Sequence, residues 1–385
     1  MNSPRRIPGL IAIALGALFM STVLASPAGA AYPDRSAALT AFESIAADQT
    51  VYPGWTGSVA ACNVGTESAG SLAATLHTVN VVRTLAGLES VTFDSARNRD
   101  ALAAALMVRA LNGIDHDPDQ SSPCYSKAGA VASGQSNLYM GLSGAEAIVG
   151  YVEDPGVSSL SHRRWLLDPA AMEFGSGSTG TTNALSVTGS HKSGSRMNGL
   201  TDDELVAWPS PGWFPSPLVF KDWSAAIGTG SATDVSSARV SVTIDGVAVP
   251  VTGQRKLEPG SGAGVTLGWQ ASLPASAASG DHVMKVSITG AKIKGELQTV
   301  GYTVNTFDPA DRGTGSGAPP DLTDPVVPAG TAGSGVSAQC RIRTAGFTKA
   351  KKSLRKASKS HRKALIRKAK KSVEITKRAR RLACG

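Results

Sequence analysis

Apolar residues recur at three- and four-residue spacing over residues 71–88 and again over residues 95–111, which predicts two amphipathic helices. Gly87 can end the first helix, because glycine readily adopts the left-handed conformation that follows a helix. Asp94 or Ser95 can cap the second helix, and Asn112-Gly113 can end it. The two apolar stripes are formed by Leu72, Leu76, Val79, Val82 and Ala86, and by Leu102, Ala105, Leu106 and Ala110.

A different pattern begins near Trp208. The segment AWPSPGWFP contains three prolines, which excludes a helix or a central strand. Beyond it, valine and isoleucine alternate with other residues over 240–244 and again over 247–251, separated by Asp245-Gly246. Both turn residues tolerate positive φ angles, so the pattern predicts a hairpin with a type I′ turn. The further strand-like runs GVTLGWQA, HVMKVSITG and GYTVNTF extend this to a small β-sandwich.

The first thirty residues read as a signal peptide. Arg5 and Arg6 precede an apolar run from Leu10 to Leu24, and Ala28-Gly29-Ala30 fits a small-residue cleavage site. The apolar run is shorter than the about 20 residues that span a bilayer, although an uncleaved anchor is the alternative. We therefore expect a secreted or cell-surface associated protein with no transmembrane segment after signal removal.

The charge of the chain is concentrated at its C-terminus. Residues 341–381 hold eighteen Lys or Arg and one acid, a net charge of +17, whereas the whole chain carries +9. A segment of this kind binds polyanions by non-specific electrostatics, and outside a cell these are anionic surface polymers or lipids. In this basic segment only Phe347 could stack on a base, so we expect no sequence-specific nucleic acid binding. A solubilising appendage without a partner is the alternative.

Four cysteines remain after signal removal, an even number that indicates disulfides in an exported protein. Three pairings are open, and we favour Cys62–Cys124 and Cys340–Cys384 because each then stays within one unit. A single helix would hold Cys340 and Cys384 on the order of 60 Å apart, so their bridge requires a hairpin of two helices. No pair has the C-x-x-C spacing of a zinc site.

Polar residues that could bind a ligand or a metal ion occur in three motifs. His116 lies in DHDPDQ, Ser136 and Asn137 lie in SGQSNLYMG, and Glu153 and His162 lie in GYVEDPGVSSLSHRRWLLDP. Their order, together with TVNVVRTLAGLESVTFD, resembles the CAP superfamily of cysteine-rich secretory, antigen 5 and pathogenesis-related proteins, also called the SCP domain. The resemblance implies a cleft in which two His and two Glu meet, but Ser136 stands where the family has its second Glu.

We therefore expect an α+β protein. Residues 31–200 form an α-β-α sandwich of CAP type, and residues 201–308 form the small all-β sandwich. The motif Trp-Pro-x-Pro-Gly resembles an extension that accompanies some bacterial CAP domains. A Gly/Pro-rich linker over 309–337 and a basic helical hairpin over 338–385 complete the chain. In the HRRWLL segment we expect Trp165, Leu166 and Leu167 in the core, and Arg163 or Arg164 paired with Glu153 or Asp154 or facing the cleft.

His116 and His162, with Glu153, could supply the three protein ligands of a catalytic zinc site. Ser136 cannot replace the missing carboxylate, so any divalent metal is expected to bind weakly, and no other cofactor is indicated. The chain has no G-x-S-x-G, no H-E-x-x-H and no Gly-rich phosphate loop after a strand, so we assign no catalytic residue.

Our leading hypothesis is a non-enzymatic module that binds an extracellular ligand in this cleft. The resemblance implies lipids, sterols or wall components as ligands. A metal-dependent hydrolase that uses His116, Glu153 and His162 is one alternative. A structural or adhesion protein with an inert cleft, whose histidines only hydrogen-bond to the scaffold, is another.

Overall fold

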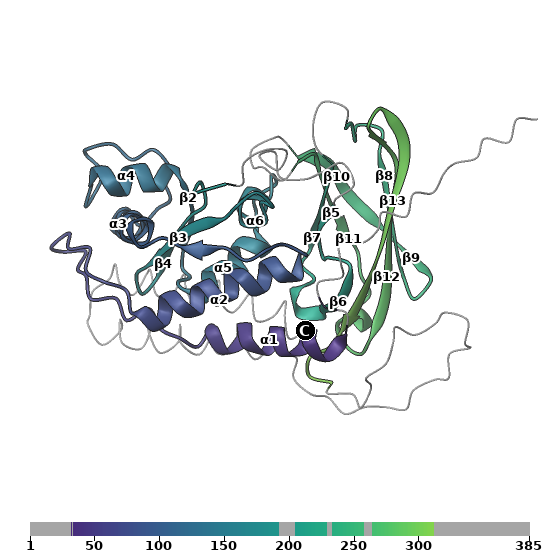
Figure 1. Ribbon diagram of the computed structural model, residues 1–385, viewed down its shortest axis with the longest axis horizontal. Helices are drawn as coiled ribbons and strands as arrows, with labels where there is room; N and C mark the ends of the chain where they lie inside the picture. The colour runs from purple at the N-terminus through teal and green to yellow at the C-terminus, as the bar shows by residue number, and fades with distance from the viewer. Residues whose placement is uncertain (1–31, 33, 192–204, 229–232, 258–263, 312–385) are drawn as a thin grey trace, which may run out of the picture.

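The computed structural model describes residues 32, 34–191, 205–228, 233–257 and 264–311 (Figure 1). The predicted signal peptide, nearly all of the predicted linker, and the basic segment with Cys340 and Cys384 lie outside the described residues. No helix within the described ranges is long and apolar enough to cross a membrane.

The first half of the described chain is a layered arrangement of helices around one sheet. The sheet has the order β1-β3-β4-β2, with β1 parallel to β3 and the other pairs antiparallel. α3 and α4 pack on one face of this sheet, while α2 and α5 pack on the other and α1 lies against them (Figure 1). The helices are α1 (Arg35–Asp48), α2 (Ala69–Leu85), α3 (Ser95–Leu111), α4 (Lys127–Gly134), α5 (Ala145–Glu153) and α6 (Ser161–Leu166), and the strands are β1 (Thr92–Phe93), β2 (Ser136–Met140), β3 (Glu173–Ser178) and β4 (Thr182–Ser186).

Two glycines explain how closely α3 approaches this sheet. A Cβ atom added at Gly177 of β3 would lie 2.0 Å from the backbone nitrogen of Leu102, and one at Gly175 would lie 2.3 Å from the Cβ of Arg97. Real side chains do not tolerate such distances, so only glycine lets the helix rest on the strand. The facing side of α3 is correspondingly small, with Ala101, Ala104 and Ala105 fully buried.

Both helices predicted from the apolar stripes are present. α2 begins and ends two to three residues earlier than predicted, and Gly87 takes the left-handed conformation just after it (φ 74°). The side chain of Asp94 caps α3 by accepting a hydrogen bond from the backbone of Arg97 (2.8 Å), and Asn112 ends it with φ 56°. α1 was not predicted, although Asp34 caps it and Ala38, Ala41, Phe42 and Ile45 form its buried stripe.

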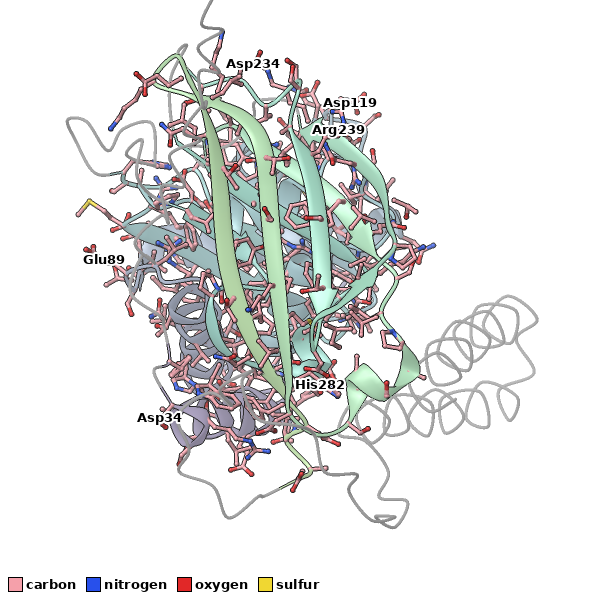
Figure 2. The ribbon with its side chains drawn as sticks, turned by 90° about the vertical axis from the view of Figure 1, so that its right-hand side faces the viewer. Asp34, Glu89, Asp119, Asp234, Arg239 and His282 are labelled. Carbon is pink, nitrogen blue, oxygen red and sulfur yellow. A yellow bond between two sulfur atoms is a disulfide. The ribbon has the colours of Figure 1, made fainter. Side chains whose placement is uncertain are left out.

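The strands expected in the second half are also present and form two sheets. The first has the order β10-β11-β7-β5, and the second, seen face-on in Figure 2, has the order β6-β13-β12-β8-β9. All pairs are antiparallel except β6 with β13. The strands are β5 (Leu205–Trp208), β6 (Gly212–Pro215), β7 (Asp222–Ile227), β8 (Arg239–Ile244), β9 (Val247–Val249), β10 (Val251–Leu257), β11 (Thr266–Ala271), β12 (His282–Ile293) and β13 (Glu296–Phe307).

Two local predictions for this half are confirmed. Asp245 and Gly246 have φ values of 49° and 81°, so the turn between β8 and β9 has positive φ at both central positions, as a type I′ turn requires. The proline-containing segment that starts at Ala207 supplies the end of β5 and all of β6. Each of these is an edge strand of its sheet, where proline costs no ladder hydrogen bond.

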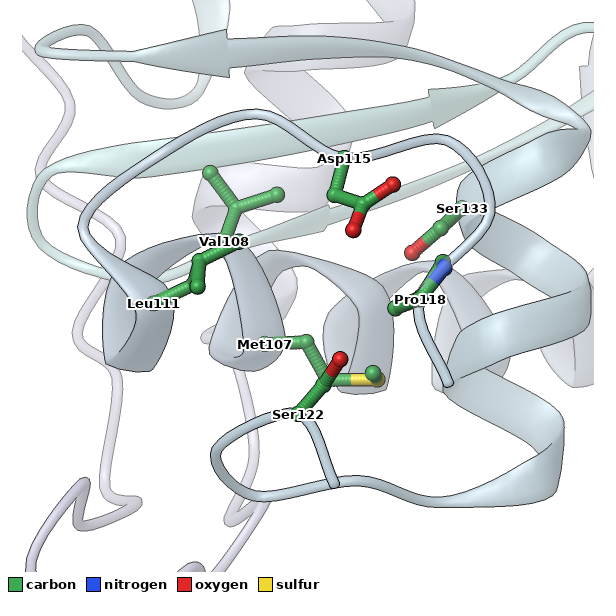
Figure 3. Close-up of a pocket in the computed structure, with 7 residues that line it drawn as sticks. All are labelled: Met107, Val108, Leu111, Asp115, Pro118, Ser122 and Ser133. Carbon is green, nitrogen blue, oxygen red and sulfur yellow. The ribbon is translucent and has the colours of Figure 1, made fainter. Parts of the chain in front are cut away.

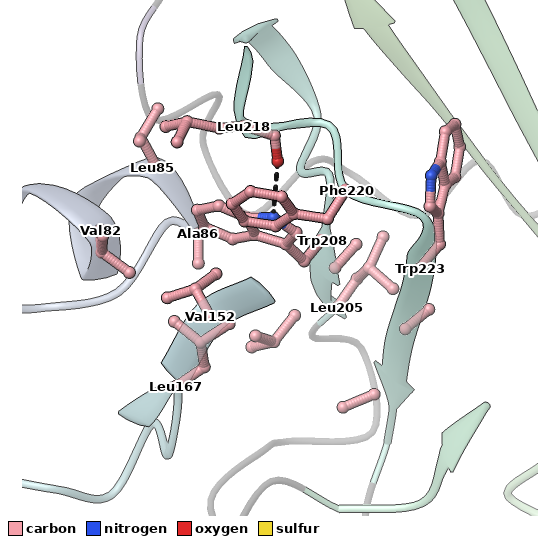
Figure 4. Close-up of a cluster of buried hydrophobic side chains, with 14 of the residues drawn as sticks. Val82, Leu85, Ala86, Val152, Leu167, Leu205, Trp208, Leu218, Phe220 and Trp223 are labelled. Carbon is pink, nitrogen blue, oxygen red and sulfur yellow. Dashed lines mark hydrogen bonds between the residues drawn. The ribbon is translucent and has the colours of Figure 1, made fainter. Parts of the chain in front are cut away.

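One cluster of buried apolar side chains joins the two halves (Figure 4). Trp208 is fully buried at its centre, stacks on Phe220 with ring centroids 6.4 Å apart, and donates its indole N–H to the carbonyl of Leu218 (3.0 Å). Val82 and Leu85 of α2 reach the same cluster. Because packing continues from the helices into the β-sheets, the domain boundaries given above stay predictions.

Candidate functional site

His162 lies in the first turn of α6 and is held by a buried acid. Oδ1 of Asp154 lies 2.7 Å from Nδ1 of the imidazole, and Oδ2 accepts hydrogen bonds from the backbone nitrogens of His162 (3.1 Å) and Arg163 (3.4 Å). The Asp154 side chain is 1% exposed and that of His162 is 20% exposed. Since a carboxylate oxygen accepts hydrogen bonds, Nδ1 carries a proton, and Nε2 presents a lone pair in the neutral form of the ring.

His116 is held in the same tautomer by a different partner. Its Nδ1 donates to the backbone carbonyl of Ser133 (2.9 Å), and the residue is exposed in the loop that follows α3. A carbonyl oxygen cannot donate, so Nδ1 carries a proton, and Nε2 presents a lone pair in the neutral form of this ring as well. Both predicted histidines are therefore set up to accept a hydrogen bond or to bind a cation through Nε2.

The two histidines contact one short segment at the junction of α4 and β2. His116 bonds to Ser133, and four residues later the side-chain amide of Asn137 donates to the backbone carbonyl of His162 (2.9 Å). The ring of His162 also lies against Tyr151, with centroids 5.6 Å apart. Burial raises the pKa of Tyr151 well above its usual value, so its hydroxyl stays protonated and can donate to the carbonyl of Asn137 (2.8 Å). Asn137 is therefore a scaffold residue of the site.

Ser136 is placed beside this junction but takes no part in a catalytic triad. It is 6% exposed, and within the described residues its hydroxyl oxygen is buried without a hydrogen-bond partner. A serine nucleophile would have to bond to the imidazole that accepts its proton. The His162–Asp154 pair is therefore not completed to a triad by this serine.

Glu153 is half-buried at the end of α5, and its backbone carbonyl lies 3.3 Å from Nη2 of Arg163. In the part of the chain that the structure describes, no three His, Cys, Asp or Glu side chains form a group that could hold a metal ion. The three-ligand set of His116, Glu153 and His162 is therefore not assembled here. Weak zinc binding by the two histidines stays a prediction.

Arg163 does not face a cleft, in contrast to one of the roles considered for it. It is fully buried, and its guanidinium donates to backbone carbonyls, including those of Val152 (2.6 Å) and Asp222 (2.8 Å). Burial lowers its pKa to about 10, with the attraction of Asp154 acting in the opposite direction. Leu166 and Leu167 fill the core as predicted, while Trp165 is only partly buried at its edge.

A small pocket adjoins the loop that carries His116 (Figure 3). Its floor is apolar and comes from α3, and its rim is polar. Its cavity volume of about 10 Å³ is close to the minimum that holds one water molecule, so the pocket is too small for a ligand group. The lining residues are Met107, Val108, Leu111, Asp115, Pro118, Ser122 and Ser133.

The predicted disulfide Cys62–Cys124 is present, with the two Cα atoms 4.9 Å apart. It ties the loop before α2 to the loop between α3 and α4, which also carries His116. Closing a separation of 62 residues restricts the unfolded chain strongly. The bridge therefore limits how far the His116 loop can move.

Sequence reasoning missed the half-buried acid Glu67. Its carboxylate accepts from the hydroxyl of Ser71 and from the backbone of Ser178, both at 2.6 Å, and burial raises its pKa to about 7. Ser178 ends β3, whereas Ser136 begins β2 at the opposite end of the sheet, so Glu67 is remote from the histidines. The only signal in the sequence was its place before Ser68, the cap of α2.

Comparison with known proteins supports a CAP domain in the central part of the chain. Residues 76–189 match the CAP family model, described as the cysteine-rich secretory protein family. The match contains all five predicted site residues and supports a CAP domain, a kind of domain found typically in secreted proteins. The Cys62–Cys124 disulfide is consistent with that location. No curated protein matches the chain.

Proposed function

We propose that this CAP-domain chain is an exported binding protein that takes an extracellular ligand at the α4–β2 junction and does no chemistry on it. The observation that carries the proposal is the common tautomer of the two histidines. Each ring uses Nδ1 to bond to the scaffold and so directs an Nε2 lone pair away from that bond. Such a pair suits a ligand with O–H or N–H donors, or a weakly held divalent cation.

Two features favour binding over catalysis. The hydroxyl of Ser136 has no hydrogen-bond partner within the described residues, so it is not activated by His162. The third ligand that a catalytic zinc requires is not brought to the histidines in the same part of the chain.

Lipids or wall components remain the proposed ligand class, on the family resemblance. The pocket beside the His116 loop does not select among these ligands, because its volume of about 10 Å³ suits a single water molecule. The basic segment over 338–385 would hold the protein at an anionic surface, since it carries a net charge of +17.

Zinc is a suitable probe for the histidine pair. Calorimetric titration with Zn²⁺ should show weak binding that is lost in His116→Gln and in His162→Gln. The matched control is His77→Gln, because His77 also bonds through Nδ1 to an acid, Asp48 (2.7 Å), but lies on α2 outside the site. A tight stoichiometric site lost in His162→Gln would support the hydrolase instead. Equal zinc binding by all four proteins would support an inert cleft.

A further inference from the structure

The segment between α5 and α6 has an unfavourable backbone at both ends. Asp154 and Leu160 have φ values of 53° and 49°, a left-handed conformation that is costly for residues other than glycine and least so for Asp and Asn. Leu160 is fully buried, which helps to hold it in place. Because Asp154 sets the orientation of His162, whatever stabilises residues 154–160 also determines the position of the imidazole.

Part of this support comes from the second half of the chain rather than from the CAP domain. Arg255 lies on β10, and its Nε donates to the carbonyl of Ser158 (2.8 Å), in the middle of the segment. Its Nη2 donates to Oδ1 of Asp222 on β7 (3.2 Å), and its Nη1 donates to the carbonyl of Gly253 (2.9 Å). One guanidinium therefore joins the segment to two strands of the sheet.

The sheet is built to let Arg255 reach this far. In the order β10-β11-β7, the residue paired with Arg255 on the intervening strand is Gly268, where a Cβ would lie 3.4 Å from Cζ of the guanidinium. The side chain therefore crosses β11 over a residue without a side chain. Asp222 is held in turn by Gln270 (3.1 Å), and its backbone carbonyl accepts from the buried Arg163. The two arginines thus meet at Asp222, one through its side chain and one through its backbone.

We propose that Arg255 is a positioning residue for His162, so that the β-sheets act as a support for the binding site. The inference rests on the proposed function only in giving His162 a role. The planar guanidinium holds Ser158 and Asp222 at once, which an ammonium group cannot do with the same geometry. Without it, residues 154–160 relax toward less strained conformations, and the bond between Asp154 and His162 loosens.

The test compares Arg255→Ala and Arg255→Lys with the control Lys256→Ala, which removes the same charge from the neighbouring exposed position of β10. Two readouts need no ligand: the ¹⁵N shifts of the His162 ring, which report its tautomer, and hydrogen exchange at the backbone amides of His162 and Arg163. Arg255→Ala should raise exchange at these amides about tenfold and add the Nε2–H tautomer. Arg255→Lys should show a smaller rise in exchange than Arg255→Ala, and Lys256→Ala should match the wild type.

Ring shifts and exchange in Arg255→Ala that equal those of Lys256→Ala would overturn the proposal. So would a rise in exchange that is uniform over the whole chain, because that is general destabilisation. Zinc titration of the same variants tests the proposed function of the histidines separately from the positioning role of Arg255. If the wild type binds no zinc through His162, the proposed function loses its support, while the ring shifts still decide the role of Arg255.

Discussion

The carboxylate of Asp154 lies 2.7 Å from Nδ1 of His162 and is almost fully buried, whereas the neighbouring Glu153 is half-buried. Asp154 follows the end of α5 in the left-handed conformation, and that conformation turns its side chain toward α6. The acid that bonds to His162 is therefore Asp154, the neighbour of the Glu153 that was predicted from the motif.

Asp154→Ala should destabilise the protein by about 2 kcal/mol in urea unfolding, because the imidazole and two backbone nitrogens lose a buried acceptor. Asp48→Ala is the matched control, since Asp48 also bonds to a histidine and to the hydroxyl of Thr78. Its histidine side chain is 51% exposed, so water can replace the lost bond and the loss should be smaller. Equal losses in the two variants would show that burial of the Asp154 pair adds nothing.

Glu67 should make the protein less stable as the pH rises. Burial raises its pKa from 4.5 to about 7 in the folded state, so folding favours the protonated acid. Its stabilising contribution is complete below about pH 4.5 and is lost as the pH rises through about 7. The shift in the pKa of Glu67 corresponds to a loss of at most about 3 kcal/mol of unfolding free energy between the two pH values.

Glu67→Gln keeps the shape of the side chain and removes the titration. Its unfolding free energy should fall less than that of the wild type between pH 4.5 and pH 8, measured by urea unfolding at both pH values. The control is Glu173→Gln, because Glu173 pairs with Arg97 near the surface. Parallel pH curves for wild type and Glu67→Gln would contradict a raised pKa at this position.

His282 should stabilise the protein most in its charged form. Its Nδ1 lies 2.7 Å from Oδ2 of Asp245, and its Nε2 lies 2.8 Å from the carbonyl of Ser279, so both nitrogens must donate. Figure 2 shows His282 at one end of the face-on sheet. Burial alone would lower its pKa, but the bonds to Asp245 and to the carbonyl oxygens outweigh burial and raise the pKa above 6.5. This contribution is complete below pH 6.5 and is lost as the pH rises through the folded-state pKa.

His282→Ala should therefore reduce the unfolding free energy more at pH 5.5 than at pH 9. Thermal unfolding at the two pH values measures this difference. The control His77→Ala removes a histidine that bonds through Nδ1 to Asp48, so it reports the effect of deleting one hydrogen bond between a histidine and an acid. A loss in His282→Ala that does not depend on pH would mean that the ring is neutral in the folded protein.

Deleting residues 338–385 should abolish most binding to anionic vesicles and leave the described fold intact. The deletion removes the net charge of +17 and leaves an acidic protein. Binding of the full chain should also weaken with added salt, because the Debye length falls from about 30 Å at 0.01 M to about 8 Å at 0.15 M. Sedimentation with vesicles of anionic lipid, and with neutral vesicles as the control, measures both effects. Equal binding by the truncated chain would place the attachment surface in the folded part.

The sequence by itself determined the features that depend on neighbouring residues. The stripe that begins at Leu72 specified α2, and Asp94 and Asn112 specified the two ends of α3, because helix periodicity and caps are local. The turn at Asp245-Gly246 was predictable for the same reason, since its φ angles depend on those two residues. The positions of His116 and His162 in their motifs were enough to single them out as candidate site residues.

Only the tertiary structure decided which residues surround those histidines. That Asp154 rather than Glu153 bonds to His162 follows from one left-handed residue whose conformation is stabilised by long-range contacts. The burial of Glu67 depends on Ser178, 111 residues away, and the support from Arg255 reaches Ser158 across 97 residues. Such contacts leave no periodic trace in the chain, because each depends on a single pair of residues that meet only after the sheets have packed.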